Sequence, residues 1–367
     1  MRIVADKDIP YLKGVAEAFG EVEYLSGDKF TREAVREADT LIVRTVTRFG
    51  RELLAGSNVK LICSATIGFD HIDTAYCTQS GIAWRNAPGC NSGSVMQYVV
   101  SALIVLSRLK NSPLDGKTIG VVGVGNVGKK VAKACRLLGM RVLLNDPPRQ
   151  LAKPSDEFVD LETVRREADF ITFHTPLTKE GEFKTLQLAD HRFFSSLTKK
   201  PVIINTARGG IIDTDAIKEA IVRQQISGAI IDCWENEPVI DLEYMRMVDI
   251  ATPHIAGYSA DGKANASRIA LENLCAFWHL PALPIQSICV PNAACSVIDM
   301  DALDGSAHDA ILQTYNPLQD YRRLLANPSQ FSRLRAQYPL RREYAAYTLL
   351  NASKETGTLL TELGFGV

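Results

Sequence analysis

The chain has 367 residues, of which 46% are hydrophobic and 23% charged, so its composition is that of a folded globular protein. This length exceeds a single ordinary core and predicts two or three domains. The formal net charge of −1, from 41 basic and 42 acidic side chains, argues against a broad nucleic-acid surface. No apolar run is long enough to predict a membrane span, and no signal peptide is expected because the start, MRIVADKD, reads as a strand of the fold.

The first ninety residues alternate short apolar runs with a helical segment, which predicts a small α/β domain. The runs MRIVAD, TLIVRT and VKLICSAT are expected strands, and residues 11–19 are an expected helix. An apolar-rich segment from Gly93 to Leu109 is expected to form a long helix that is capped by Asn91 or Ser92. The turn cluster NSPLDGK then predicts a crossing between domains.

A second α/β domain is expected to begin at Lys117. Helical stretches at residues 127–138 and 214–223 separate some of its six strand-like runs, which are TIGVVG, RVLLND, DFITFH, PVIINT, GAIIDC and VDIATP. Six such strands with crossover helices predict a doubly wound parallel sheet of the Rossmann type.

The pattern changes again after His254. A helix over residues 262–279 is expected to return the chain to the first domain, and the remainder reads as a separate α+β unit in which RREYAAYTLL is a strand and ETGTLLTELGF a helix. The predicted α/β architecture is therefore a flavodoxin-like lid or substrate domain of residues 1–92 and 257–283, a Rossmann dinucleotide-binding domain of residues 93–256, and a small C-terminal domain of residues 284–367.

A glycine fingerprint marks the start of the second domain. Gly123, Gly125 and Gly128 form GxGxxG, with Asn126 and Val127 between them, after an expected strand and at the start of an expected helix. In that context the motif predicts that a dinucleotide pyrophosphate binds the helix N-terminus.

Asp146 ends the next expected strand, where a carboxylate can accept hydrogen bonds from ribose hydroxyls. It would repel a 2′-phosphate, so NAD is favoured over NADP, although the neighbouring Arg149 weakens this preference. A surface aspartate that caps the following Pro-Pro turn is the alternative interpretation.

Three charged residues each follow an apolar run in the second domain: Arg208 in INTARGG, Glu237 in DCWENEP and His254 in ATPHIAG. The carboxyl ends of parallel strands share one edge of a sheet, where ligands bind. An arginine suits a substrate carboxylate, a histidine exchanges a proton with a hydroxyl, and an acid supports the protonated histidine. This combination predicts oxidation of a 2-hydroxy acid. His174 also ends an expected strand, and we expect it to be structural or close to the cofactor.

No metal site is expected, because the eight cysteines show no paired CxxC spacing. Several lie inside apolar runs, which is typical of buried, reduced thiols in a cytoplasmic protein.

The motifs GVGNVG, HTPLT, NTARGG, DCWENEP and TPHIAG, in this order, resemble the D-2-hydroxyacid dehydrogenase family over roughly residues 1–280. The resemblance implies that Arg208 binds the substrate carboxylate, that His254 is the acid/base, and that Glu237 is its partner. It further implies NAD contacts from residues outside the fingerprint, namely Thr175, Thr206, Ala207, Arg208, Asp232 and Gly257.

Further segments, including VRTVT, SATIGFDHID and PHIAGYSADGKA, resemble members of the family that act on a phosphorylated acid. That resemblance implies substrate contacts from Thr45, Thr66 and Tyr258, and a homodimer built by the C-terminal domain. A phosphorylated acid needs a second anion site beyond Arg208. Arg44 is the best basic candidate for this phosphate site, with Arg48 behind it, although a surface ion pair would also explain Arg44. Backbone N–H groups around Ile67-Gly68 are an alternative anion site.

The sequence thus predicts an NAD-dependent dehydrogenase of a small phosphorylated 2-hydroxy acid, in a cytoplasmic homodimer that binds neither nucleic acid nor membrane. A 3-phosphoglycerate-type or unphosphorylated hydroxyacid dehydrogenase remains an alternative. A NAD(H)-sensing corepressor on the same scaffold is a third possibility, because a fold can host unrelated functions.

Overall fold

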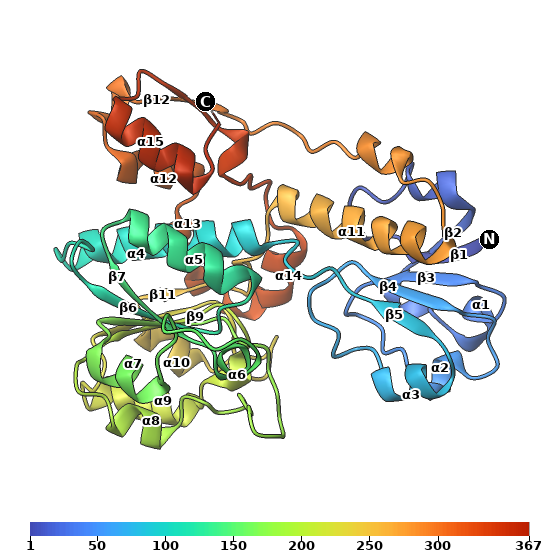
Figure 1. Ribbon diagram of the computed structural model, residues 1–367, viewed down its shortest axis with the longest axis horizontal. Helices are drawn as coiled ribbons and strands as arrows, with labels where there is room; N and C mark the ends of the chain where they lie inside the picture. The colour runs from blue at the N-terminus through green and yellow to red at the C-terminus, as the bar shows by residue number, and fades with distance from the viewer. Residues whose placement is uncertain (367) are drawn as a thin grey trace. The chain divides into compact units, whose positions relative to one another are not determined.

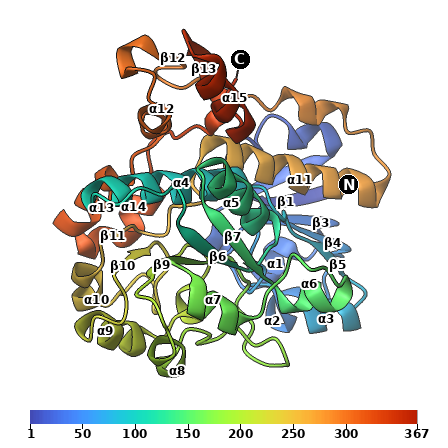
Figure 2. The ribbon, with the colours of Figure 1, turned by 60° about the vertical axis from the view of Figure 1, so that its left-hand side comes forward.

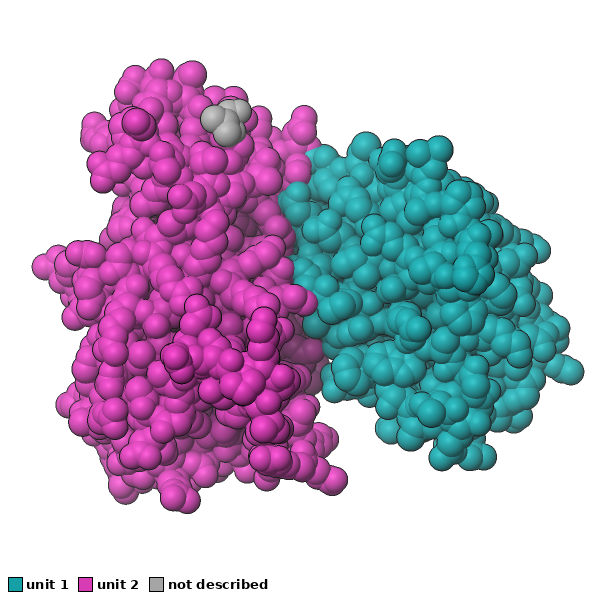
Figure 3. Space-filling model, viewed as in Figure 1, with its two compact units in different colours: residues 1–91, 259–291 teal, residues 92–258, 292–367 magenta. Residues whose placement is uncertain are grey.

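The computed structural model describes residues 1–366, and the chain divides into two compact units. Unit 1 comprises residues 1–91 and 259–291, and unit 2 comprises residues 92–258 and 292–367 (Figure 3). The C-terminal residues thus belong to the same compact unit as the second predicted domain. The separate C-terminal domain and the exact domain boundaries stay predictions.

Unit 1 contains a five-stranded parallel sheet in the order β2-β1-β3-β4-β5 (Figure 1). This is the flavodoxin-like order that the sequence interpretation named. The strands are β1 (Arg2–Asp6), β2 (Glu21–Leu25), β3 (Thr40–Val43), β4 (Leu61–Ser64) and β5 (Ala83–Arg85). The helices of unit 1 are α1 (Arg32–Val35), α2 (Arg51–Leu54), α3 (Thr74–Gln79) and α11 (Ala260–Trp278), with 3-10 turns at Ala16–Phe19, Gly27–Lys29 and Leu283–Ser287.

Alternating side chains of the central strands supply both faces of this sheet. On one face, Ile42 and Leu61 pack with Leu271 and Leu274 of α11. On the other face, Leu41, Val43 and Ile62 pack with side chains of α1, α2 and α3. Because both faces are covered, the central strands β3 and β4 are buried along their whole length, as expected for a parallel sheet. The helix α11 is capped by Ser259 and begins at Ala260, two residues before the sequence prediction, and it returns the chain to unit 1 as expected.

Unit 2 contains a six-stranded parallel sheet in the order β11-β10-β9-β8-β6-β7. Its strands are β6 (Thr118–Val122), β7 (Arg141–Asn145), β8 (Phe170–Phe173), β9 (Val202–Asn205), β10 (Gly228–Ile231) and β11 (Ile250–Ala251), so all six predicted strands are confirmed. An isolated bridge from Leu144 to Phe158 occupies the place of a further strand beside β7. With that bridge counted, the order is the doubly wound Rossmann order, and it reverses between β6 and β8.

Helices cover both faces of this second sheet (Figure 2). On one face lie α4 (Ser92–Leu109) and α5 (Asn126–Leu137), and on the other lie α7 (Leu161–Glu167), α8 (His191–Ser195), α9 (Thr214–Val222) and α10 (Leu242–Met247). The short helix α6 (Pro147–Ala152) follows β7. By length and composition α4 could cross a membrane, but 78% of its apolar window is buried, as in the core helix of a soluble protein.

The C-terminal part of unit 2 is α+β, as predicted. Its strands β12 (Val297–Asp299) and β13 (Thr348–Leu350) form a two-stranded parallel sheet. Its helices are α12 (Ala307–Thr314), α13 (Pro317–Ala326), α14 (Phe331–Ala336) and α15 (Lys354–Leu363), with 3-10 turns at Asp301–Leu303, Pro328–Gln330 and Tyr344–Ala346.

Two local predictions are wrong. Residues 11–19 form only a 3-10 turn at Ala16–Phe19, because Tyr11 and Gly14 adopt left-handed backbone angles, with φ of 62° and 90°, that end an α-helix. In RREYAAYTLL, only the last three residues are a strand, since Tyr344–Ala346 turns back as a 3-10 helix. The sequence interpretation also missed β2 and β5, whose residues are polar or only half-buried at the sheet edges.

Candidate active site

The glycine fingerprint lies where the strand order of unit 2 reverses. It follows β6, and α5 begins directly after Gly125, which provides no side-chain cap for the first turn. The space that a Cβ would occupy at Gly125 is open to at least 4 Å, so a ligand can approach this backbone closely. The uncapped N–H groups of α5 therefore offer the pyrophosphate site that the motif predicts.

The other two glycines are required by close backbone approach. Gly123 has φ of 90°, and a Cβ there would lie 2.8 Å from the backbone of His174 and Thr175 after β8. A Cβ at Gly128 would lie 2.0 Å from the carbonyl oxygen of Gly123. Any side chain at these positions would push apart the loop, the helix and the neighbouring strand end.

Asp146 follows β7, has two structural hydrogen bonds and pairs with the Arg149 side chain, whose Nε lies 3.6 Å from Oδ2. Its Oδ2 accepts from the N–H of Val124 at 2.8 Å, and its Oδ1 accepts from the N–H of Arg149 at 3.1 Å, as the cap of α6. Asp146 therefore caps the helix, as the alternative interpretation predicted. Each carboxylate oxygen keeps a further lone pair, so the predicted ribose contact is compatible with these bonds. The bond to Val124 ties this carboxylate to the glycine loop.

Thr175 is a second residue that fits a bound dinucleotide. Its Oγ1 is buried and has no hydrogen-bond partner within residues 1–366. A buried hydroxyl without a partner is uncommon in native proteins and is explained if a ligand supplies the missing bond. Its neighbour His174 bonds through Nε2 to Thr172 at 3.0 Å, and burial lowers the pKa of His174 to about 3. His174 is thus neutral near neutral pH and is not the acid/base.

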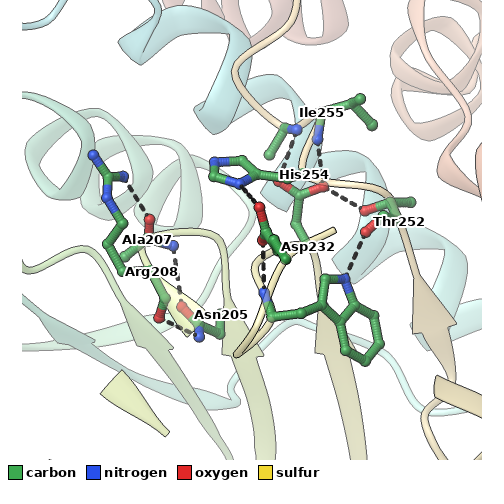
Figure 4. Close-up of polar contacts among 10 residues, drawn as sticks. Asn205, Ala207, Arg208, Asp232, Thr252, His254 and Ile255 are labelled. Carbon is green, nitrogen blue, oxygen red and sulfur yellow. Dashed lines mark hydrogen bonds and ion pairs between the residues drawn. The ribbon is translucent and has the colours of Figure 1, made fainter. Parts of the chain in front are cut away.

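Arg208 follows β9 in a loop that is held by Asn205 (Figure 4). The amide of Asn205 donates to the carbonyl of Arg208 at 2.9 Å and accepts from the N–H of Ala207 at 3.1 Å. The guanidinium makes one bond, from Nη1 to the carbonyl of Ala207 at 2.8 Å, and no ion pair within residues 1–366. It is therefore available to bind a carboxylate in a bidentate manner.

Glu237 and His254 form a bonded pair after the next two strands, β10 and β11. His254 Nδ1 lies 2.7 Å from Glu237 Oε2, and Glu237 Oε1 accepts from the N–H of Trp234 at 2.8 Å (Figure 4). Burial raises the pKa of Glu237, but the bond to His254 and its charge outweigh burial, so the pKa lies below its usual value. An ionised carboxylate only accepts hydrogen bonds, so Nδ1 carries the proton and Nε2 presents its lone pair.

The loop that carries His254 is strained and firmly held. His254 has φ of 55°, which is rare for a residue other than glycine. The fully buried carboxylate of Asp232 accepts three bonds from this loop, from Thr252 Oγ1 at 2.6 Å, Ile255 N–H at 2.7 Å and Ala256 N–H at 2.9 Å. Asp232 therefore fixes the position of His254, and its predicted NAD contact stays a prediction.

Two further residues support this loop from helix α4 and the C-terminal segment. Tyr98 is fully buried in α4, and its hydroxyl bonds to Thr252 at 2.7 Å. Arg341 is 5% exposed, donates to the carbonyl of Ala256 at 2.5 Å and packs over the ring of Tyr315 at 4.4 Å. The sequence interpretation missed Asn205, Tyr98, Thr252 and Arg341. Asn205 and Thr252 had a visible signal, their places in the INTARGG and TPHIAG motifs, whereas Tyr98 and Arg341 had none that assigned them to the site.

Cys233 lies beside the pair, and its sulfur is within 4.8 Å of ligand atoms of Glu237 and His254. A metal ion would need the thiolate form of this cysteine. Burial raises the pKa of Cys233 well above its ordinary value, so the thiol stays protonated at neutral pH. The triplet is better explained by packing around the Glu237–His254 pair.

The remaining predicted residues are divided between the units. Gly257 and Tyr258 follow the His254 loop in unit 2, and Thr206 is 8% exposed beside Ala207. In unit 1, Arg44–Thr45 follow β3, and Thr66 follows the adjacent β4 and donates to the carbonyl of Gly68 at 2.9 Å.

Arg44 does not resemble a free anion site. Its Nε and Nη2 pair with both oxygens of Asp6 at 2.9 and 3.0 Å, and Nη2 also lies 2.9 Å from Asp8. Asp6 is 2% exposed, so moving Arg44 away would leave a buried charge without its partner. This arrangement favours the ion-pair alternative.

Comparisons with known proteins agree with this geometry. The family described as D-isomer specific 2-hydroxyacid dehydrogenase, NAD binding domain, matches residues 101–256, and a domain of unknown function matches residues 290–364. A relative from Bacteroides thetaiotaomicron, named erythronate-4-phosphate dehydrogenase, is 52% identical and covers 95% of this chain and 99% of its own length. A Porphyromonas gingivalis protein of the same name is 40% identical over the whole of both chains.

Solved structures show the same architecture. The NAD-bound 3-phosphoglycerate dehydrogenase of Entamoeba histolytica is similar at a TM-score of 0.65 and 28% identity, over 76% of this chain and 95% of its own. The NAD complex of a Staphylococcus aureus formate dehydrogenase is similar at a TM-score of 0.62 and 25% identity, over 77% of this chain and 97% of its own. With the sheet order, the fingerprint and the Arg208, Glu237 and His254 arrangement, these likenesses establish that the chain belongs to the D-isomer-specific 2-hydroxyacid dehydrogenase family.

Proposed function

We propose that this protein is an erythronate-4-phosphate dehydrogenase, which oxidises 4-phospho-D-erythronate to (R)-3-hydroxy-2-oxo-4-phosphooxybutanoate with NAD, on the route to pyridoxal phosphate. The observation that carries the chemistry is the His254–Glu237 bond of 2.7 Å at the sheet edge that also carries the unpaired Arg208. The substrate assignment is supported by the relatives of that name, which match nearly the full chain.

Arg208 orients the substrate. Its guanidinium has no acidic partner within residues 1–366, and a planar guanidinium binds a carboxylate through two parallel hydrogen bonds. A carboxylate fixed in this way determines where the adjacent C2 hydroxyl lies. Orientation of this kind contributes to the rate because the reacting groups no longer need to find each other.

His254 removes the proton. Its Nδ1 is held by Glu237, so Nε2 is the nitrogen that accepts the proton of the C2 hydroxyl. The Glu237 carboxylate, with its lowered pKa, stays ionised and stabilises the imidazolium that forms. The bound NAD supplies the acceptor for the hydride that leaves C2. The reverse reaction uses the same groups, with His254 as the acid.

The residues present fit NAD at the switch point of the sheet. The N-terminus of α5, the open approach at Gly125 and the unpartnered hydroxyl of Thr175 would hold the cofactor. The carboxylate of Asp146 favours NAD over its 2′-phosphorylated form.

The test is a substrate comparison. Purified protein and NAD are mixed with 4-phospho-D-erythronate, D-3-phosphoglycerate or D-lactate, and NADH absorbance is followed with and without a 2-oxo acid that recycles the cofactor. A clear preference for 4-phospho-D-erythronate is the expected result. A preference for either other acid would keep the family chemistry and reject this substrate, and NADH binding without any turnover would favour a sensor role.

We also propose a cytoplasmic homodimer built by the C-terminal residues. A two-stranded sheet is barely stable alone, and β12-β13 leaves Val297 58% and Leu350 50% exposed. A second copy that covers these side chains would explain their exposure. Light scattering after size-exclusion chromatography should give twice the 40.3 kDa chain mass, and Leu350→Glu should shift the protein toward monomer.

A further inference from the structure

The proposed substrate carries two anionic groups, a carboxylate and a phosphate. Arg208 accounts for one of them. The predicted second cation, Arg44, is held by Asp6 and Asp8 in unit 1, so its charge is already balanced. A basic side chain that has no anionic partner and lies near the catalytic groups is therefore a better candidate for the phosphate site.

Arg335 in helix α14 meets the first requirement. It is half-buried, it forms no ion pair within residues 1–366, and its Nε is buried without a hydrogen-bond partner. Its guanidinium lies over the ring of Tyr258, 5.5 Å from the ring centre. An arginine that is partly desolvated on an aromatic ring and unpaired is well prepared to bind an anion.

Arg335 also lies near the catalytic groups. Tyr258 stands four residues after His254, and its N–H donates to the carbonyl of Ile255 at 2.8 Å, so its backbone is tied to the catalytic loop. Burial raises the pKa of Glu237, whereas the contacts with His254, the bond from the Trp234 N–H and then the charge of Arg335 lower it.

Helix α14 is not a loose attachment. Phe331 in its first turn is 1% exposed and belongs to the same core cluster as Trp234 and Ile211, which lie in the Glu237 and Arg208 loops. The Tyr258 ring packs edge-to-face against the ring of Tyr338 at 5.9 Å between ring centres, so a residue of the C-terminal segment holds the Tyr258 ring in place. The position of Arg335 is therefore set by packing within unit 2.

We propose that Arg335 binds the phosphate group of the substrate, with Tyr258 as the surface on which its guanidinium rests. The proposal depends on the proposed function, because it names the residue that distinguishes a phosphorylated from an unphosphorylated 2-hydroxy acid. The C-terminal segment thereby contributes a specificity residue to the active site of its own chain.

The experiment compares two substrates that differ only in the phosphate, 4-phospho-D-erythronate and D-erythronate. Arg335→Gln should raise the KM for the phosphorylated acid roughly 10- to 100-fold, the usual effect of losing charge-assisted bonds. Its kcat/KM for D-erythronate should stay within about twofold of the wild type. Arg335→Lys keeps the charge without the planar fork and should recover part of the loss.

Arg333→Gln is the matched control. Arg333 lies on the same helix, is exposed and bonds to Gln337 at 3.0 Å and Gln330 at 3.4 Å. Its substitution should therefore leave kcat/KM unchanged for both substrates. Equal losses on both substrates in Arg335→Gln would overturn the proposal, because they would mean that Arg335 acts only through Glu237 or through the fold.

Failure of the proposed function has a different signature, since wild-type protein would then not oxidise 4-phospho-D-erythronate. In this case, calorimetric titration of that acid into the NADH complex still tests whether Arg335 binds the phosphate group. Weaker binding to Arg335→Gln than to Arg333→Gln supports the phosphate site, and equal binding to both variants, or no binding to the wild type, overturns it.

Discussion

The substitution Asp232→Asn tests whether the buried carboxylate holds the catalytic loop. Asp232 accepts bonds from Thr252, Ile255 and Ala256 and is fully buried. Asparagine keeps one carbonyl oxygen but turns an NH2 group toward a backbone N–H. One charge-assisted bond is lost and a buried donor faces another donor, which costs about 1.5–3 kcal/mol.

Part of this cost is offset. Burial raises the pKa of Asp232, although the charge of His254 and the three bonds oppose this, so a neutral amide avoids some of the cost of burying a charge. We therefore expect the free energy of unfolding to fall by about 1–3 kcal/mol. Because the loop carries His254 at a strained backbone angle, kcat should fall by roughly 10- to 100-fold through misplacement of the imidazole.

Urea unfolding followed by circular dichroism measures the first quantity, and NADH formation measures the second. Asp213→Asn is the matched control, because Asp213 caps α9 through one bond, to Ala216 N–H at 2.9 Å, and asparagine caps about as well as aspartate. That variant should stay within about 0.5 kcal/mol of the wild type. If Asp232→Asn matched the control in both stability and kcat, the loop-holding role would be refuted.

Three other variants have defined outcomes. Gly128→Ala places a methyl group 2.0 Å from the Gly123 carbonyl oxygen, so thermal unfolding should show a loss of about 1–3 kcal/mol and NADH fluorescence titration a weaker affinity; unchanged values would contradict the close-packing argument. Burial lowers the pKa of His174 from 6.5 to about 3, so the unfolded chain binds more protons between these values. Stability should therefore fall as pH drops through this window, less steeply in His174→Gln than in the wild type, and equal slopes would contradict the shift. Arg208→Lys should lower kcat/KM by at least about tenfold in steady-state assays because lysine cannot form the bidentate pair, and full activity would exclude that contact.

The sequence was sufficient for the parts of the site that depend on strand ends. Arg208, Glu237 and His254 each follow a buried strand, and β9, β10 and β11 are neighbours in the sheet. An apolar run followed by a charged residue can be recognised in a short stretch of sequence as a strand end. Parallel pairing of the strands then places these charged residues together at the carboxyl edge of the sheet. The glycine fingerprint was equally accessible, since its spacing reflects contacts within one strand–turn–helix unit.

What the sequence could not provide were partnerships between distant residues. Asp232 appeared as a cofactor contact, but its bonds to the His254 loop depend on the register of β10 and β11. Arg44 appeared as an anion site because its partner Asp6 lies 38 positions away. Arg335 lies in no quoted segment, and Arg341 appeared as the first residue of RREYAAYTLL, an expected strand. Packing of the C-terminal segment brings both to the catalytic loop.

The most direct test of the central claim is a single-turnover measurement on His254→Asn. Enzyme in excess of 4-phospho-D-erythronate is mixed with NAD and NADH formation is followed, with NADH affinity measured in parallel. We expect unchanged NADH affinity and a rate about 10²–10⁴-fold below that of the wild type, the usual cost of losing a general base. A His254→Asn rate equal to that of the wild type would contradict the assignment of His254 as the base and the mechanism built on it.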